Sequence, residues 1–196
     1  GLGDVYKRQI SDALLDEYLK QDENARCGIE VMGGKGKIFV TGEVTSVAKV
    51  DVERVVRRVL RDIGYFSNYE IINNLGCQSP DIALGTNDEV GGAGDQGMMF
   101  GYACDDTEEL LPTAMVILQK LSRWYDEKRK ECPYLGSDGK AQITGEYDEN
   151  WKLKKIRYFT ISYQNDECHR EELDQMIRDE CQRICNYYQI LVEKFL

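Results

Sequence analysis

The sequence predicts an α+β fold made of two similar units, each a small sheet covered by helices on one face. Helix-like and strand-like patterns follow one another in the same order twice along the 196 residues. Apolar residues thin out between the two series, near residues 84–91. We therefore expect one domain over residues 10–84 and another over residues 92–196.

The first unit is expected to open with a helix. Residues 1–9 lack apolar periodicity and are interpreted as a tag, linker or reading-frame remnant outside the fold. From residue 10 to about residue 22, apolar residues recur at helical spacing. These are Ile10, Leu14, Leu15, Tyr18 and Leu19.

A hairpin, a helix and a strand are expected next. Strand patterns over 28–32 and 37–46 flank a glycine-rich turn, which is typical of a hairpin. A strongly amphipathic helix then starts at 50–51 and stops at Gly64. Residues 69–73 are predicted to form the next strand.

The second unit is expected to repeat this order of elements. We expect a strand over 98–103, a helix over 108–130, and a hairpin of strands 141–147 and 153–163. Residues 171–195 have the spacing of a final helix, with Leu173, Ile177, Ile184, Tyr188 and Leu191 inward.

Composition narrows the class of protein. A hydrophobic fraction of 42% with a mean hydropathy of −0.51 is typical of a soluble globular protein, and no apolar run reaches the roughly 18 residues of a membrane helix. The net charge of −10 argues against nonspecific nucleic-acid binding. Seven cysteines without a CxxC pair or secretory signal favour reduced thiols in the cytoplasm. Cys181 and Cys185 lack a second ligand pair, which argues against zinc.

The richest stretch for ligand binding is Gly91–Gly97, where four glycines surround Asp95 and Gln96. Glycine lets another group approach the main chain closely. The stretch suggests a polar ligand held at a strand end, and an ordinary glycine-rich turn is the alternative. Gln78, just past a strand end, is either a ligand contact or a turn residue.

Three further positions are candidates. Glu43 interrupts an apolar strand and is either a ligand-binding carboxylate or an edge-strand carboxylate facing water. Glu30 is a carboxylate with apolar neighbours. It is either a ligand-binding residue or a residue on the outward side of its strand. The sequence Asp138-Gly139-Lys140 places an anion and a cation beside a glycine and by itself suggests a type I′ hairpin turn.

Five strings together resemble the S-adenosylmethionine synthase, or methionine adenosyltransferase, family. The resemblance runs from about residue 10 to about residue 166, in the family's order and approximate spacing. The strings are Ile10–Ala13, Gly42–Thr45, Gln78–Ile82, Gly92–Ala103 and Asp138–Thr144.

The resemblance implies a reaction in which methionine sulfur attacks C5′ of ATP and triphosphate is cleaved to phosphate and pyrophosphate. It assigns methionine to Glu43, Gln78 and Asp95, and potassium to Glu30. ATP would contact Asp138, Gly139 and Lys140. Residues 85–91 would be a mobile active-site loop. Mg²⁺ and K⁺ are the implied cofactors.

The resemblance also implies a pseudo-threefold fold with a site shared across a homodimer, possibly within a tetramer. The family's His-Pro-Asp-Lys segment and third domain have no counterpart here, so the magnesium ligands are expected to be absent from this chain. We therefore expect a fragment that is inactive alone. The alternative is a non-catalytic folded module that dimerises through its flat sheet.

Overall fold

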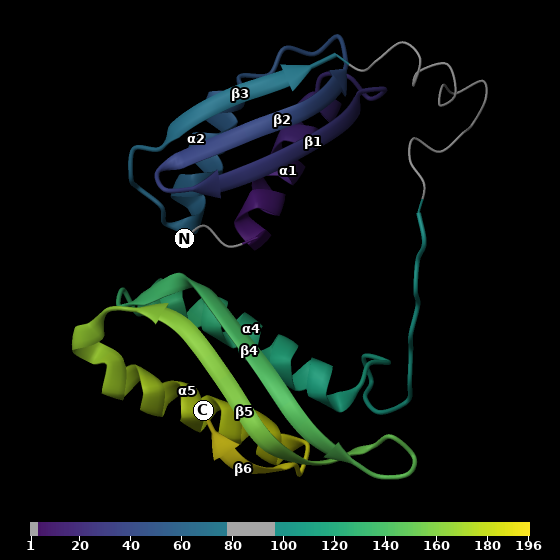
Figure 1. Cartoon of the computed structure of the whole chain (residues 1–196), viewed down its shortest axis with the longest axis vertical. Helices are drawn as coiled ribbons and strands as arrows, with labels where there is room; N and C mark the ends of the chain where they lie inside the picture. Colours follow the sequence, from purple (N-terminus) through teal and green to yellow (C-terminus); the bar gives the residue numbers. More distant parts are fainter. Residues whose placement is uncertain (1–3, 78–96) are drawn as a thin grey trace. The chain divides into compact units, whose positions relative to one another are not determined.

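The computed structural model describes residues 4–77 and 97–196. They belong to two compact units that divide between Met98 and Met99 (Figure 1). Each unit has the order helix, strand, strand, helix, strand, which confirms the α+β repeat that the sequence predicts. In the described part of the chain, no helix combines the length and apolar character that a membrane crossing requires.

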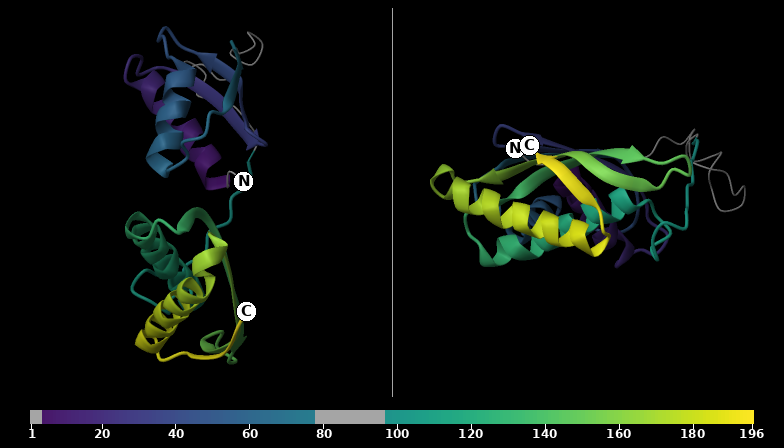
Figure 2. Two further views of the ribbon diagram at one scale, coloured as in Figure 1. Left: turned by 90° about the vertical axis from the view of Figure 1, so that its left-hand side faces the viewer. Right: turned by 90° about the horizontal axis from the view of Figure 1, so that it is seen from below.

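Unit 1 contains a three-stranded sheet. Figure 2 shows that its helices lie on one face of this sheet. Its elements are α1 (Asp4–Leu19), β1 (Arg26–Gly34), β2 (Lys37–Thr45), α2 (Val52–Ile63) and β3 (Glu70–Gly76). The middle strand β2 pairs antiparallel with β1 and parallel with β3. A helix connects β2 to β3 because a tight turn cannot join parallel strands. The predicted first hairpin is confirmed.

The first helix begins earlier than expected. The sequence places its start near Ile10 and residues 1–9 outside the fold, whereas α1 begins at Asp4. Tyr6 lies one helical turn before Ile10, is 8% exposed, and continues the buried ridge toward Leu14. A single tyrosine gives too weak a periodic pattern to show this in advance. Burial of its ring in the core of unit 1 favours the longer helix.

α2 has the boundaries and the buried face that the sequence predicts. The carboxylate of Asp51 caps its start by accepting a hydrogen bond from the Arg54 amide at 3.0 Å. Gly64 ends it with a φ of 104°, a left-handed conformation that glycine adopts readily. The buried side chains are Val52, Val55, Val56, Val59, Leu60 and Ile63.

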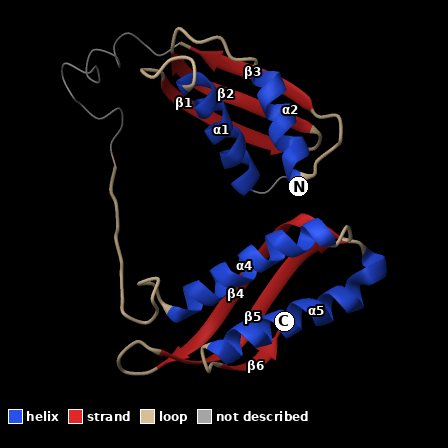
Figure 3. Ribbon diagram, turned by 180° about the vertical axis from the view of Figure 1, so that it is seen from behind, coloured by secondary structure: helices blue, strands red, loops and turns tan. Residues whose placement is uncertain are grey.

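Unit 2 has the same topology, and Figure 3 shows its helices on one face of the sheet. Its elements are α4 (Thr113–Glu131), β4 (Leu135–Tyr147), β5 (Leu153–Asn165), a 3₁₀ turn (Glu167–His169), α5 (Arg170–Tyr187) and β6 (Leu191–Phe195). The middle strand β5 pairs antiparallel with β4 and parallel with β6. Ile156 and Phe159 of β5 are fully buried in the core of this unit.

The end of unit 2 differs from the prediction of one helix over residues 171–195. α5 stops early, and residues 191–195 form the strand β6. Gln189 adopts a φ of 58°, and the Ile190 amide donates a hydrogen bond to the Cys185 carbonyl at 2.9 Å. β6 then pairs with β5, a partner distant in sequence that local periodicity does not reveal.

Two predictions at the start of unit 2 are also wrong. Residues 98–103 form no strand, and α4 begins at Thr113, after Pro112, rather than at residue 108. A proline restricts the preceding residue to extended conformations, which delays the helix. The apolar side chains of the 98–103 segment are 72–95% exposed, and these are Met98, Met99, Phe100 and Tyr102.

Candidate functional site

The candidate site of unit 1 lies on the sheet face that the helices leave uncovered. Successive side chains of a strand point to opposite faces. Val40 and Val44 of β2 are buried in the core, so Thr41 and Glu43 lie on the other face, where both are exposed. Glu30 of β1 lies on this face too, because it pairs with Thr41 across the ladder.

Glu43 is bordered by glycine on both neighbouring strands. Its register partners are Gly28 on β1 and Gly76 on β3. A Cβ built at either glycine would meet no atom nearer than 3.9 Å, so open space flanks the Glu43 side chain. A ligand can therefore approach this carboxylate along exposed main chain, which is a recurrent use of glycine in strands.

Gly42, which precedes Glu43, meets a different constraint. Its φ is 118°, and a Cβ there would lie 2.0 Å from the carbonyl oxygen of Gly28. Only glycine fits at this position without a shift of the backbone. The two glycines thus let β1 and β2 approach closely beside the carboxylate.

Four polar residues gather around this point, and we call them the carboxylate cluster: Glu30, Thr41, Glu43 and Asn74. The Thr41 hydroxyl accepts a hydrogen bond from the side-chain amide of Asn74 and donates one to the main-chain carbonyl oxygen of Asn74, both at 3.5 Å. Glu30 and Glu43 are diagonal neighbours, a relation that places residues about 7–8 Å apart. Neither carboxylate has an ion pair within residues 4–77 and 97–196. The cluster suits an ammonium group or a cation that prefers oxygen ligands.

The expectation of a hairpin turn at residues 138–140 is wrong. These residues lie inside β4, where Gly139 pairs with Tyr163 and Lys140 with Ser162. Pairing with the long strand β5 overrides the local turn preference, and a register shift between Leu135 and Gly139 absorbs the irregularity. The predicted hairpin of strands 141–147 and 153–163 is confirmed, and its turn lies at residues 148–152.

Lys140 lies on the uncovered face of the second sheet. Its neighbour Ala141 pairs with Ile161, which packs against the core, so alternation places Lys140 on the opposite face. Lys140 is exposed, and no described carboxylate lies within ion-pairing distance of it. Asp138 is two residues before Lys140 in the same strand, so it lies on the same face of the sheet, where it is half-buried. Lys140 therefore presents a free positive charge to an anionic ligand.

The structure brings only some of the predicted residues together. Glu30 and Glu43 share one face of unit 1, whereas Asp138, Gly139 and Lys140 belong to unit 2. Gln78 and Asp95 lie outside the described residues. The alternative for Glu43 was an edge-strand carboxylate facing water. Glu43 is exposed, but it lies on β2, which is the middle strand, so the edge-strand part of that alternative is wrong.

Among the described residues, no group of three or more His, Cys, Asp or Glu side chains could hold a metal ion. Cys181 and Cys185 are buried in α5, and burial raises the pKa of Cys181 to about 12 and of Cys185 to about 11. Both thiols are therefore protonated at neutral pH, and a thiol must lose its proton to bind zinc.

Sequence reasoning missed Thr41 and Asn74. Thr41 lies two residues before Glu43 in the same strand, so strand alternation could have placed it on the same face. Asn74 could not be found this way, because its position beside Thr41 follows from the parallel pairing of β2 with β3.

Comparison with known proteins agrees with the geometry of two repeated units. The family model described as "S-adenosylmethionine synthetase, N-terminal domain" matches residues 1–80, and "S-adenosylmethionine synthetase, central domain" matches residues 90–193. The chain is 40% identical over 192 residues to an S-adenosylmethionine synthase of Clostridium tetani (strain Massachusetts / E88), a match covering 86% of this chain and 49% of that protein. The chain thus spans about half the length of this curated relative. It belongs to the S-adenosylmethionine synthetase family.

Proposed function

We propose that this chain is the N-terminal and central part of a methionine adenosyltransferase. The enzyme would form S-adenosylmethionine from ATP and L-methionine. The observation that carries this proposal is the match of two consecutive family domains, in order, to most of the chain. The methionine sulfur would form a bond to C5′ as the C5′–oxygen bond to triphosphate breaks. Water would then cleave the triphosphate to phosphate and pyrophosphate.

A thioether nucleophile needs no general base, so binding and alignment would supply most of the rate enhancement. We assign methionine binding to Glu43, Gln78 and Asp95. The open, glycine-flanked carboxylate of Glu43 supports the first assignment, because an ammonium group pairs with a carboxylate. Gln78 follows Gly76, the register partner of Glu43, by only two residues along the chain.

We assign ATP binding to Asp138, Gly139 and Lys140. The exposed Lys140 ammonium group supports this assignment, since lysine acts on phosphate as a compact point charge. Positive charge near the leaving triphosphate would stabilise the transition state. Residues 85–91, outside the described residues, would be the loop that covers the site.

Potassium and magnesium are the ions we propose for the complete enzyme. Glu30 would hold K⁺, and the oxygens that Glu30 and Thr41 present side by side are of the chemical kind such a cation takes. Mg²⁺, when bound, would neutralise the phosphates, and we assign it to no residue of this chain. We further propose a cytoplasmic homodimer, or a tetramer, formed through the uncovered sheet faces.

The second candidate function is that of a non-catalytic module of the same family. The observation favouring it is that each unit has its own hydrophobic core. Such a module would fold and dimerise without turning over substrate.

One assay separates the two candidates. The purified chain is mixed with ATP, methionine, Mg²⁺ and K⁺, and S-adenosylmethionine and phosphate are measured. Product at a rate near that of a full-length relative contradicts the module, whereas binding without product contradicts catalysis by this chain alone. Light scattering on the same sample tests dimerisation, and a monomer contradicts the interface between sheet faces.

The role of Glu43 has its own test. We expect Glu43→Ala to weaken methionine binding by about tenfold or more while ATP binding is unchanged, because only the ammonium contact is lost. Titration calorimetry with each ligand measures both affinities in a version that binds them. The exposed Glu23→Ala variant is the control for the loss of one negative charge. Equal loss of both affinities would contradict the assigned role.

A further inference from the structure

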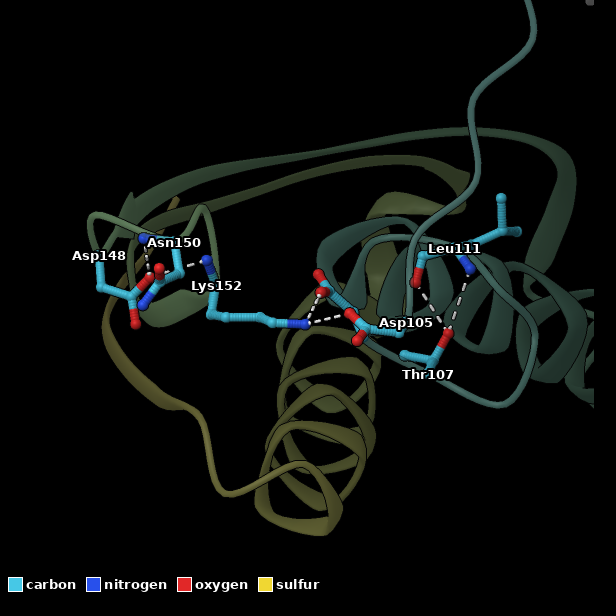
Figure 4. Close-up of polar contacts among 7 residues, drawn as sticks. Asp105, Thr107, Leu111, Asp148, Asn150 and Lys152 are labelled. Carbon is cyan, nitrogen blue, oxygen red and sulfur yellow. Dashed lines mark hydrogen bonds and ion pairs between the residues drawn. The ribbon is translucent and has the colours of Figure 1, made fainter.

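Two turns of unit 2 that are far apart in sequence meet at a single ammonium group (Figure 4). The Nζ of Lys152 lies 2.6 Å from a carboxylate oxygen of Asp105 and 2.6 Å from one of Asp106. Lys152 ends the β4–β5 hairpin turn, and the two aspartates directly follow the residue 97–104 segment that enters unit 2. We call these three residues the Lys152 clamp.

The hairpin turn holds Lys152 by contacts of its own. The carboxylate of Asp148 accepts hydrogen bonds from the amides of Asn150 and Lys152 at 2.9 and 3.0 Å. The Asp148 amide donates to the Lys152 carbonyl at 3.0 Å, and Trp151 adopts a φ of 61°. The backbone of Lys152 is therefore fixed independently of the aspartates it contacts.

The segment on the other side is also a defined turn. The Cys104 amide donates to the Leu110 carbonyl at 3.1 Å, and the Leu110 amide donates to the Thr107 carbonyl at 3.0 Å. The Thr107 hydroxyl donates to the Leu111 carbonyl at 2.8 Å. These bonds close residues 104–111 into a loop that leads into α4.

The two carboxylates of the clamp differ in burial. The Asp106 side chain is 8% exposed, whereas that of Asp105 is 93% exposed and that of Lys152 is 44% exposed. The hydrogen bond from Lys152 lowers the pKa of Asp105, and the hydrogen bonds to Asp105 and Asp106 raise the pKa of Lys152, so Asp105 and Lys152 are both charged at neutral pH. An exposed ion pair contributes little, but a buried carboxylate that loses its partner is strongly destabilising.

We infer that Lys152 is a positioning residue that holds the loop of residues 104–111 against the hairpin. It thereby fixes the position at which the segment of residues 97–103 ends. Those residues make no described strand or core contact of their own, so the nearest fixed point for them is this loop. That the position of this segment matters for methionine binding rests on the proposed function, in which Asp95 lies two residues before Gly97.

Hydrogen exchange on the full chain tests the clamp without any ligand. We expect Lys152→Ala to speed exchange of the amides in residues 104–111 by about tenfold, because Asp106 is left buried without its partner. Lys152→Arg should restore most of the protection. Asp106→Asn should act like Lys152→Ala, whereas Asp105→Asn should have a small effect. Unchanged exchange in both Lys152→Ala and Asp106→Asn would overturn the inference.

The controls separate the clamp from general loss of structure. Lys154→Ala removes an exposed lysine of the neighbouring strand and should leave exchange of the loop unchanged. Peptides from β5 and α5 should keep wild-type exchange in every variant. Acceleration throughout unit 2 would overturn a local positioning role.

A methionine titration then tests the link to function. In a version that binds methionine, Lys152→Ala should weaken affinity about threefold or more, and Lys152→Arg should restore it. Loss of loop protection without any change in methionine affinity would overturn the effect on methionine binding. The role of Lys152 in holding the loop would still stand. Failure of the wild-type protein to bind methionine counts against the proposed function. The hydrogen-exchange experiment still tests whether Lys152 holds the loop.

Discussion

At the scale of single residues, the candidate site of unit 1 depends on neighbours in β2 with opposite requirements. Gly42 must lack a side chain because the carbonyl oxygen of Gly28 occupies that space. Glu43 needs a long side chain with open surroundings, which Gly28 and Gly76 provide. The sequence indicated Glu43 as an interruption of an apolar strand. It did not indicate that glycines would flank it, because that follows from strand register.

The constraint at Gly42 leads to a prediction about stability. Gly42→Ala should lower the free energy of unfolding by about 2 kcal/mol or more, because alanine at a φ of 118° is strained and its Cβ clashes with main chain. Gly28→Ala is the matched control and should be neutral or slightly stabilising, since its Cβ would make only an ordinary contact, 3.9 Å from the main-chain oxygen of Glu43. Urea unfolding of both variants measures the difference. Equal effects of the two variants would contradict the close approach of β1 and β2.

At the scale of elements, side chains in loops hold helices and strands together. Asp22, just beyond α1, accepts hydrogen bonds from the Ser46 hydroxyl at 2.6 Å and the Val47 amide at 3.0 Å, and so ties α1 to the end of β2. The bond from Ser46 is the main cause that lowers the pKa of Asp22 below its usual 3.8. The charged form is therefore the one that the folded state favours.

This lowered pKa gives unit 1 a pH dependence of defined sign. A carboxylate whose pKa is lower in the folded state stabilises it fully above the unfolded pKa, and that contribution is lost as pH falls through the folded value. Asp22→Asn should reduce stability at neutral pH, and the difference from wild type should shrink toward about pH 3. Urea midpoints across this range measure it, with exposed Asp16→Asn as the control. A constant difference at every pH would contradict the role of the charge.

Elements differ in how far the sequence predicts them. α2 was predicted with its start, its stop and its amphipathic pattern, because all three depend on residues in or next to the helix. β6 was predicted as the end of a helix, because residues 188–195 keep a helical spacing of apolar residues. Their pairing with β5 decides the outcome, and each paired residue of β5 lies 36 positions earlier in the chain.

At the scale of the whole molecule, the chain contains two hydrophobic cores that share no residue. Matched substitutions on the two middle strands should therefore act separately. Ile38→Ala in β2 and Ile156→Ala in β5 each remove a fully buried side chain, and each should destabilise its own unit by about 3 kcal/mol.

Fluorescence can distinguish the two units, because both tryptophans, Trp124 and Trp151, lie in unit 2. Ile156→Ala should lower the denaturant midpoint of tryptophan fluorescence, and Ile38→Ala should leave that midpoint unchanged. Circular dichroism, which reports both units, should respond to each variant. A shift of the fluorescence midpoint by Ile38→Ala would show that the units unfold together.

The sequence by itself determined the α+β class, the repeated order of elements, the first hairpin and α2. These follow from local periodicity, capping and turn residues. Only the tertiary structure decided that residues 138–140 continue a strand, that β6 exists, and that Glu43 lies between two glycines of neighbouring strands. Each of these depends on which strand pairs with which and in what register, and such contacts join residues too far apart for a local pattern to encode.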